Sequence, residues 1–353
     1  MFDSLKPSEA ALPVAMPAGQ RILIVTDAWE PQVNGVVRTL RTVAQELRTM
    51  GHVVEVIGPD RFRTVPCPTY SSIRLAVLPR RRLDRLIDAF RPEALHISTE
   101  GPLGLSARSW ALRNSMPFST AFHTRFPEYL QARIGLPPSI PYALLRHFHR
   151  PSSGLMVATA SLQHDLEGHG FRNLRRWSRG VELDLFRPEP RRDWGLPGPV
   201  FLYVGRVAVE KNIGAFLALD LPGSKVVVGD GPQLAALRQR YPDVHFAGVL
   251  HGADLARAYA GADVFVFPSL TDTFGLVLLE ALACGTPVAA FPVTGPVDVL
   301  EGAANIGALD HDLRAACLRA LQGDRVACRM HAERFSWQAC AERFLANLTP
   351  VQG

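Results

Sequence analysis

Short apolar runs that alternate with helical patterns constrain the fold of this chain more than any other feature. Arg21–Thr26 reads as a buried strand, and Val36–Met50 reads as a helix with one apolar face that Gly51 ends. The series continues with the apolar runs Val53–Ile57, Ala94–Ile97, Phe118–Phe122 and Leu155–Ala158. Because strands that alternate with helices are typical of βαβ units, we predict an α/β fold with a doubly wound parallel sheet.

A second series of apolar runs follows a segment rich in proline and charge. Residues 187–199 read RPEPRRDWGLPGP, which is typical of a linker. Beyond them we predict strands at Val200–Val204, Lys225–Val228, Val244–Phe246, Val264–Phe267 and Val288–Phe291. A length of 353 residues also fits two domains. We therefore predict two facing Rossmann-like domains with a cleft between them, divided into a flexible tail (1–19), a first domain (20–186), the linker (187–199), a second domain (200–334) and a C-terminal helix (335–353).

Several classes of protein are disfavoured by what the sequence lacks. No apolar run approaches the ~18–20 residues of a membrane span, and the N-terminal segment has no signal-peptide pattern. The five cysteines show no C-x-x-C spacing, so we expect reduced packing residues and no zinc site. These features predict a cytoplasmic protein.

Charge is distributed unevenly along the chain. Residues 1–200 hold 26 Lys+Arg against 18 Asp+Glu, whereas residues 201–353 hold 12 against 15. A basic half favours an anionic partner such as a membrane surface or a nucleic acid. Only three of the 38 basic residues are lysine, so a coding bias toward arginine explains the excess equally well.

Two polar segments follow predicted strands of the first domain. Asn34-Gly35 opens the first helix, where free N–H groups favour an anion, although this dipeptide is also a common turn. His123 follows Phe118–Phe122 with other polar residues, which favours a functional role over a structural one. Ligands of such sheets bind beyond the carboxyl ends of the strands, so we expect both segments at a binding site.

The loops of the second domain carry charge and glycine. Arg206 and Lys211 follow Gly205, and such a pair suits phosphate binding, although a solvated loop is the alternative. Gly229-Asp230-Gly231 follows the next strand and reads equally well as a tight turn or a binding loop. The backbone near Val249, after the third strand, could contact the edge of a base.

Pro268–Pro287 is the most specific segment. A strand ends at Phe267, a polar loop holds Asp272, and a helix then begins near Phe274, Gly275 and Leu276. Glu280 enters an apolar stretch of this helix. Burying an unpaired carboxylate is costly, so Glu280 needs a hydroxyl or cationic partner. Two ribose hydroxyls of a ligand could serve, and a structural ion pair is the alternative.

Together these segments resemble glycosyltransferase family 4, which has the two-domain GT-B fold. The resemblance runs from about Arg21 to Phe344. The segments Trp29-x-Pro31-Gln32-x-Asn34-Gly35 and His123-Thr124-x-Phe126-Pro127-x-Tyr129 are similar to the branch of sulfoquinovosyl, mannosyl and glucuronosyl transferases that act on glycerolipids. Ser336-Trp337 resembles the start of a helix that crosses back onto the first domain.

The resemblance implies a nucleotide-sugar site. Arg206 and Lys211 would neutralise the donor diphosphate, Glu280 would hold the ribose, and backbone N–H groups of Phe274, Gly275 and Leu276 would bind phosphate and sugar oxygens. His123 would touch the donor sugar, Gly35 would let the first domain approach the diphosphate, and Asn34 would also belong to the donor site. The predicted catalytic residues are thus His123, Arg206, Lys211 and Asp272, and the predicted donor-binding residues include Gly205, Gly229, Asp230, Gly231 and Val249.

Two positions depart from the family pattern, which has Glu-x7-Glu and usually Gly-Val-Asp. Asp272 replaces the first glutamate, so the shorter carboxylate puts the identity of the donor sugar in question. Glu182 stands where aspartate is usual. The sequence Asp310-His311-Asp312 fits a helix cap better than a metal motif, and fixed cations can stabilise the leaving diphosphate, so we expect no metal or other cofactor.

The expected activity is retaining transfer of a hexose from a GDP- or UDP-sugar to an acceptor hydroxyl. A glycerolipid acceptor would require a peripheral membrane protein, and six basic residues suit an anionic bilayer: Arg80, Arg81, Arg82, Arg85, Arg146 and Arg150. A soluble or polysaccharide acceptor and a nucleotide-sugar epimerase of the same fold are the alternatives. The clustered site residues argue against a nucleic-acid-binding module, and the missing glycine fingerprint argues against a nicotinamide dehydrogenase.

Overall fold

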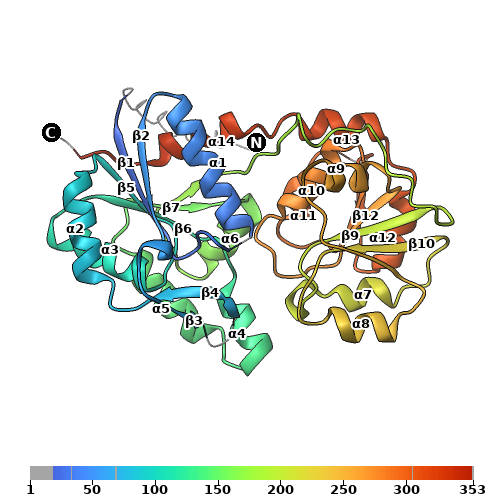
Figure 1. Cartoon of the computed structure of the whole chain (residues 1–353), viewed down its shortest axis with the longest axis horizontal. Helices are drawn as coiled ribbons and strands as arrows, with labels where there is room; N and C mark the ends of the chain where they lie inside the picture. The colour runs from blue at the N-terminus through green and yellow to red at the C-terminus, as the bar shows by residue number, and fades with distance from the viewer. Residues whose placement is uncertain (1–18, 33, 68–69, 304, 352–353) are drawn as a thin grey trace, which may run out of the picture.

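The computed structural model describes residues 19–351 except 33, 68–69 and 304. Two separate six-stranded sheets form two halves that lie side by side (Figure 1). This arrangement confirms the predicted α/β fold with two Rossmann-like units. All but one residue of the predicted N-terminal tail, 1–19, lies outside the described residues.

The first sheet is wholly parallel. Its strands, in spatial order, are β2 (Val53–Ile57), β1 (Arg21–Val25), β5 (Ala94–Ile97), β6 (Phe118–Ala121), β7 (Gly154–Val157) and β8 (Leu174–Arg176). Its helices are α1 (Gly35–Thr49), η1 (Pro59–Arg61), α2 (Arg80–Phe90), α3 (Pro102–Arg113), α4 (Phe126–Ile134), α5 (Ser139–His149) and α6 (Ala160–Gly168). Ile22, Leu23 and Ile24 have no exposed surface, because helices cover both faces of the sheet.

The second sheet is also parallel and follows the doubly wound order. Its strands, in spatial order, are β11 (His245–Gly248), β10 (Ser224–Val228), β9 (Val200–Val204), β12 (Val264–Phe267), β13 (Val288–Ala290) and β14 (Gly307–Leu309). Its helices are η2 (Val209–Lys211), α7 (Ile213–Leu217), α8 (Leu234–Arg240), α9 (Gly252–Ala260), α10 (Leu276–Ala283), α11 (Pro296–Val299), α12 (Leu313–Ala320) and α13 (Arg325–Ala332).

Some elements were not expected from the sequence. An antiparallel pair, β3 (Thr64–Cys67) and β4 (Tyr70–Ala76), is inserted between β2 and α2, and the short edge strands β8 and β14 complete the two sheets. Three-residue edge strands leave little periodicity to detect. Asp312 accepts a hydrogen bond from the Arg314 N–H at the start of α12, so it caps this helix as predicted.

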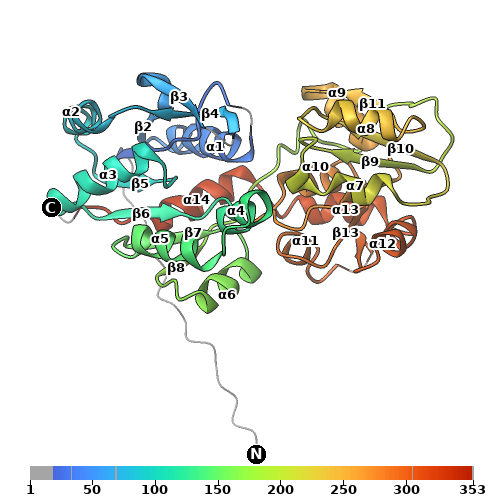
Figure 2. The ribbon, with the colours of Figure 1, turned by 90° about the horizontal axis from the view of Figure 1, so that it is seen from below.

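The last helix ties the end of the chain to the first half. Helix α14 (Trp337–Asn347) begins after Ser336, whose hydroxyl accepts a hydrogen bond from the Ala339 N–H. Its apolar face packs against α1 in a cluster that includes Trp177 and Phe344. Figures 1 and 2 show this red helix among the elements of the first half, although the preceding helix α13 lies in the second.

The strand order determines which edge of each sheet carries the predicted site segments. In each sheet the direction of winding reverses between two adjacent central strands, β1 and β5 in the first and β9 and β12 in the second. Such switch points are where α/β sheets bind ligands, beyond the carboxyl ends of the strands. The predicted site segments follow β1 and β6 in the first sheet and β9, β10, β11 and β12 in the second, so all of them lie at the carboxyl edges of the two sheets. Within the described residues, no helix is long and apolar enough to cross a membrane.

Candidate active site

Two helix N-termini meet at the interface between the halves. The Asn34 side chain caps α1 by accepting hydrogen bonds from the N–H groups of Val36 and Val37, each at 3.0 Å. Helix α10 begins after Gly275, which has a φ of 84°, and no side chain among the described residues caps it. A Cβ atom on Gly35 would lie 3.6 Å from Leu276 Cδ1, so the two ends are adjacent. Facing N-termini favour an anion between them.

The loop after β9 brings its lysine to the loop after β12. Lys211 Nζ lies 2.5 Å from Asp272 Oδ1, and both side chains are largely buried. The second Asp272 oxygen is buried without a hydrogen-bond partner among the described residues, and so can accept from a ligand hydroxyl. Arg206 is exposed in the same loop, and its carbonyl accepts a hydrogen bond from the Tyr203 hydroxyl at 2.8 Å. The loop after β9 therefore supplies a lysine paired with the Asp272 carboxylate and an exposed arginine five residues earlier.

The glycines of the second half hold three loops in contact. A Cβ atom on Gly229 would lie 1.9 Å from the carbonyl oxygen of Gly205, so a side chain there has no room. The Gly229 N–H donates to the carbonyl of Gly248 at 2.8 Å, next to the half-exposed Val249. Asp230 is exposed on the same edge. Loop packing therefore accounts for Gly229 whether or not a ligand also contacts it.

His123 lies where the two halves touch. Its carbonyl accepts a hydrogen bond from the Thr273 hydroxyl of the second half at 2.8 Å. Its Nε2 atom lies 2.8 Å from Ser98 Oγ, and its Nδ1 atom lies 3.4 Å from Arg179 Nη2. A guanidinium only donates, so this network assigns the hydrogen of the ring to Nε2. Burial, and then the Arg179 charge, hold the pKa of His123 well below its usual value.

Glu280 has both kinds of partner that its buried position requires. It lies one turn inside α10, as predicted, and is almost fully buried. Its Oε2 atom accepts a hydrogen bond from the Tyr259 hydroxyl at 2.8 Å. Its Oε1 atom accepts one from Arg38 Nη1, which reaches across from α1. The structural ion pair that the sequence left open is therefore present, between the two halves.

Sequence reasoning missed five residues that complete the site: Arg38, Ser98, Arg179, Tyr259 and Thr273. Each acts through a partner that is distant in sequence, so no local spacing marks it. Arg179 is the clearest example, because it is a 5% exposed cation with no carboxylate within ion-pair distance among the described residues. A buried charge of this kind is rare, but only the fold shows that it is buried.

The six arginines predicted to suit an anionic bilayer differ in their exposure. Arg80, Arg81, Arg82 and Arg85 are all exposed on α2. At the end of α5, Arg150 is exposed, but Arg146 is half-buried and donates to the carbonyl of His169 at 2.9 Å. His149, which the sequence placed beside these arginines, is buried against Thr120 and Glu100. Arg150 is therefore available at the surface, Arg146 only in part, and the four arginines of α2 fully.

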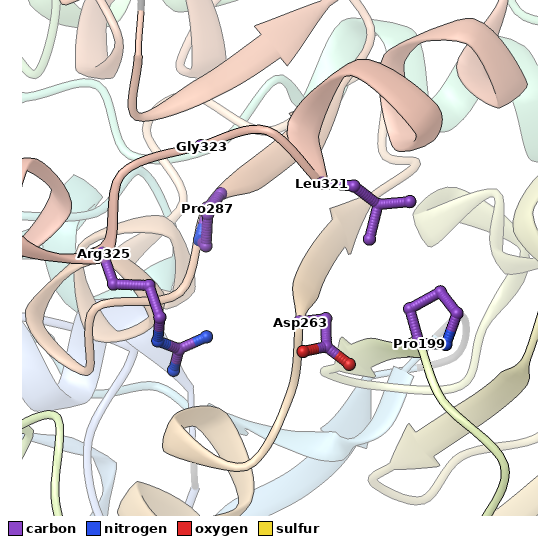
Figure 3. Close-up of a pocket in the computed structure, with 6 residues that line it drawn as sticks. All are labelled: Pro199, Asp263, Pro287, Leu321, Gly323 and Arg325. Carbon is purple, nitrogen blue, oxygen red and sulfur yellow. The ribbon is translucent and has the colours of Figure 1, made fainter.

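A hollow in the second half lies away from these residues. Pro199, Asp263 and Pro287 line it, and each immediately precedes a strand of the second sheet (Figure 3). The hollow is therefore at the amino ends of β9, β12 and β13, at the edge opposite the gathered loops. Asp263 accepts a hydrogen bond from the Val200 N–H there, so its carboxylate already has a structural partner.

Known proteins resemble this chain over most of its length. A model described as "Glycosyltransferase Family 4" matches residues 33–185, and one described as "Glycosyl transferases group 1" matches residues 198–322. A GDP-mannose-dependent alpha-mannosyltransferase of Mycobacterium tuberculosis is 30% identical, covering 95% of this chain and 98% of the relative. Sulfoquinovosyl transferase SQD2 of Arabidopsis thaliana is 29% identical, covering 88% and 69%. An alpha-monoglucosyldiacylglycerol synthase of Streptococcus pneumoniae is 28% identical, covering 85% and 78%.

Solved structures show the same architecture. Sucrose-phosphate synthase from Thermosynechococcus elongatus has a TM-score of 0.71 at 20% identity, covering 91% of this chain and 96% of that one. Anabaena HepE in complex with UDP-glucose has a TM-score of 0.66 at 15% identity, covering 93% and 98%. The fold and the matches define a glycosyltransferase with the GT-B fold. Within that class, the chain belongs to glycosyltransferase family 4.

Proposed function

We propose that this chain transfers a hexose from a GDP- or UDP-sugar to a glycerolipid hydroxyl at a membrane surface, with retention of anomeric configuration. The observation that carries the proposal is the contact between Thr273 and the carbonyl of His123. It joins the loop that holds Asp272 to the edge of the first half. A sugar held by that loop would meet an acceptor held by the first half.

The donor site is proposed on charge and geometry. A diphosphate between the N-termini of α1 and α10 would meet Arg206 and Lys211, and its sugar would offer hydroxyls to the unpartnered oxygen of Asp272. Glu280 would bind the ribose. These fixed cations would support transfer without a metal or other cofactor, because in this arrangement they would lie where charge develops on the leaving group.

The proposed reaction takes place on one face of the sugar. The bond from the anomeric carbon to the phosphate oxygen breaks, and the acceptor oxygen forms a bond to the same carbon from the same side. The acceptor proton passes to the departing phosphate oxygen. Arg206 and Lys211 stabilise that oxygen, and no side chain is required as a nucleophile. The alpha products in the names of two relatives support retention, since GDP- and UDP-hexoses usually carry the sugar through an α bond.

A lipid acceptor is supported by the relatives and by the first half. One relative is named for a glucosylated diacylglycerol. The exposed arginines of α2 lie on the half that would hold the acceptor, and they suit an anionic bilayer. The protein would then bind the cytoplasmic face of a membrane as a peripheral protein.

The test combines the donor and acceptor questions. The purified chain is incubated with GDP-mannose, UDP-glucose, UDP-glucuronate or an ADP-sugar, and with vesicles that contain diacylglycerol. We expect one donor to yield a glycolipid whose anomeric proton shows the α configuration by NMR. A β product would contradict retention. Transfer to soluble sugars alone would replace the lipid acceptor, and donor turnover without any acceptor would indicate an epimerase.

A further inference from the structure

The carboxylate proposed to bind ribose is covered from outside by an arginine of the other half. Glu280 has 4% of its side chain exposed, whereas Arg38 has 30%. Tyr259, the partner of the inner oxygen, has no exposed surface. The guanidinium therefore lies on the solvent side of the carboxylate and the tyrosine lies beneath it.

Both oxygens of Glu280 are thus engaged by the protein. A ribose hydroxyl that approaches from the interface would meet Arg38 before it reached the carboxylate. Two donors that need the same buried acceptor compete, because Oε1 cannot keep a charged hydrogen bond to Arg38 at full strength and also accept from a ligand hydroxyl. The ion pair joins α1 to α10, so its release also removes one of the contacts between the two halves.

Arg38 has a second carboxylate within reach. Its Nη2 atom lies 3.2 Å from Glu182 Oε1, and Glu182 is 45% exposed. The Arg38 guanidinium carbon also lies 5.4 Å from the centroid of the Phe186 ring, and Phe186 is four residues beyond Glu182 in the chain. If Arg38 leaves Glu280, it can keep its charge paired on Glu182, with the aliphatic stem still covered. The glutamate that departs from the family pattern at this position therefore gives the arginine an alternative partner.

We propose that Arg38 gates the nucleotide site by competing with ribose for Glu280. With Arg38 on Glu280 the site is closed, and with Arg38 on Glu182 the carboxylate is available to the nucleotide. This inference rests on the proposed function, because it requires Glu280 to bind the ribose of a nucleotide. The gate predicts that Arg38 lowers the affinity for the donor nucleotide and that Glu182 raises it.

Titration calorimetry with UDP, GDP and ADP tests the gate on the full chain. For the nucleotide that binds, Arg38→Met should lower the Kd by about tenfold, within the usual range of coupling between linked equilibria. Glu182→Gln should raise the Kd by about threefold, because it removes a partly exposed ion pair and leaves Arg38 on Glu280. Arg41→Met is the matched control, because Arg41 lies on the same helix but pairs with the exposed Glu30 and not with Glu280. The Kd of this variant for the nucleotide should not change.

Several outcomes would overturn the gate. Equal or weaker binding by Arg38→Met, or shifts of the same sign in the Arg38 and Glu182 variants, would do so. If Arg38→Met does not fold, the Glu182→Gln variant decides, and an unchanged or lower Kd refutes the gate. A 2′,3′-dideoxynucleotide should bind wild type and Arg38→Met equally, since it has no hydroxyl to compete for Glu280. If wild type binds none of the three nucleotides, the proposed function fails with the gate, whereas binding without the predicted shifts removes the gate alone.

Discussion

Lys211 Nζ lies 2.5 Å from Asp272 Oδ1, so the residue proposed to bind the phosphate and the residue proposed to bind the sugar form one ion pair. The pair ties the loop after β9 to the loop after β12. Asn212 strengthens this tie by donating to the carbonyl of Pro268 at 3.1 Å. Removal of the charge of either residue should therefore affect the position of the other.

Removal of either cation should slow transfer greatly. Arg206→Ala and Lys211→Ala each remove charge-assisted contacts worth ~2–4 kcal/mol in the transition state, which is a loss of about 30- to 1000-fold in kcat/KM. Steady-state kinetics check this, with Arg240→Ala as the control because Arg240 is exposed at the end of α8. Circular dichroism should show that both variants fold. Near-normal turnover by both would remove the assignment of the diphosphate site.

Asp272 should select the donor sugar. Glutamate at this position is one methylene longer, and Lys211 already contacts the shorter side chain. We expect Asp272→Glu to change the relative rates of competing donor sugars while the Kd of the free nucleotide stays the same. Asp272→Asn is the size-matched control and should slow every donor. A sugar preference that does not change between wild type and Asp272→Glu would reject this role.

Glu280 and Arg38 show which site residues could be predicted from the sequence and which could not. A carboxylate in an apolar helix is a local anomaly, and it correctly predicted a hydroxyl or cationic partner. Which residues supply those groups depends on how α1 and α9 pack against α10, and no spacing records that. The central strands were predicted nearly to the residue because each is a local apolar run, whereas the three-residue edge strands β8 and β14 are too short to give such a run.

The ring of His123 should stay neutral across the working range of pH. Its pKa is well below 6.5 because the ring is buried and Arg179 lies beside it, with His96 and His149 nearby. A lowered pKa means that the neutral form persists as the pH falls through the ordinary range. The profile of kcat/KM should therefore show no inflection from this histidine between about pH 6 and pH 8.

Arg179→Met tests the cause of that neutrality. Loss of the guanidinium removes a positive charge, so the pKa of His123 should rise toward its ordinary value and an acid limb should enter the profile at higher pH. NMR titration of labelled histidine would follow the ring directly. Arg172→Met, at an exposed residue of the same segment, should leave the titration unchanged. An unaltered His123 titration in Arg179→Met would mean that burial alone sets the pKa.

Helix α2 should dock the first half onto an anionic membrane. Arg80, Arg81 and Arg82 are exposed in its first turn. Leu78, two residues before the helix, is 92% exposed with Val77 beside it. Basic and apolar side chains in this order suit the interface of a bilayer. Each arginine near the surface contributes ~1 kcal/mol, so changing all three to glutamine should weaken vesicle binding by roughly 100-fold.

Flotation with vesicles of varied anionic lipid content measures this effect. Binding by wild type should rise with anionic lipid and fall as salt shortens the Debye length, while Leu78→Asn should weaken binding at every salt concentration. The control changes Arg238, Arg240 and Arg257 of the second half to glutamine, which keeps the net charge equal to that of the α2 variant. Equal loss in both triple variants would mean that net charge alone drives binding. If wild type stays in the soluble fraction at every composition, a soluble sugar becomes the better acceptor, because nothing would then hold the first half at a lipid surface.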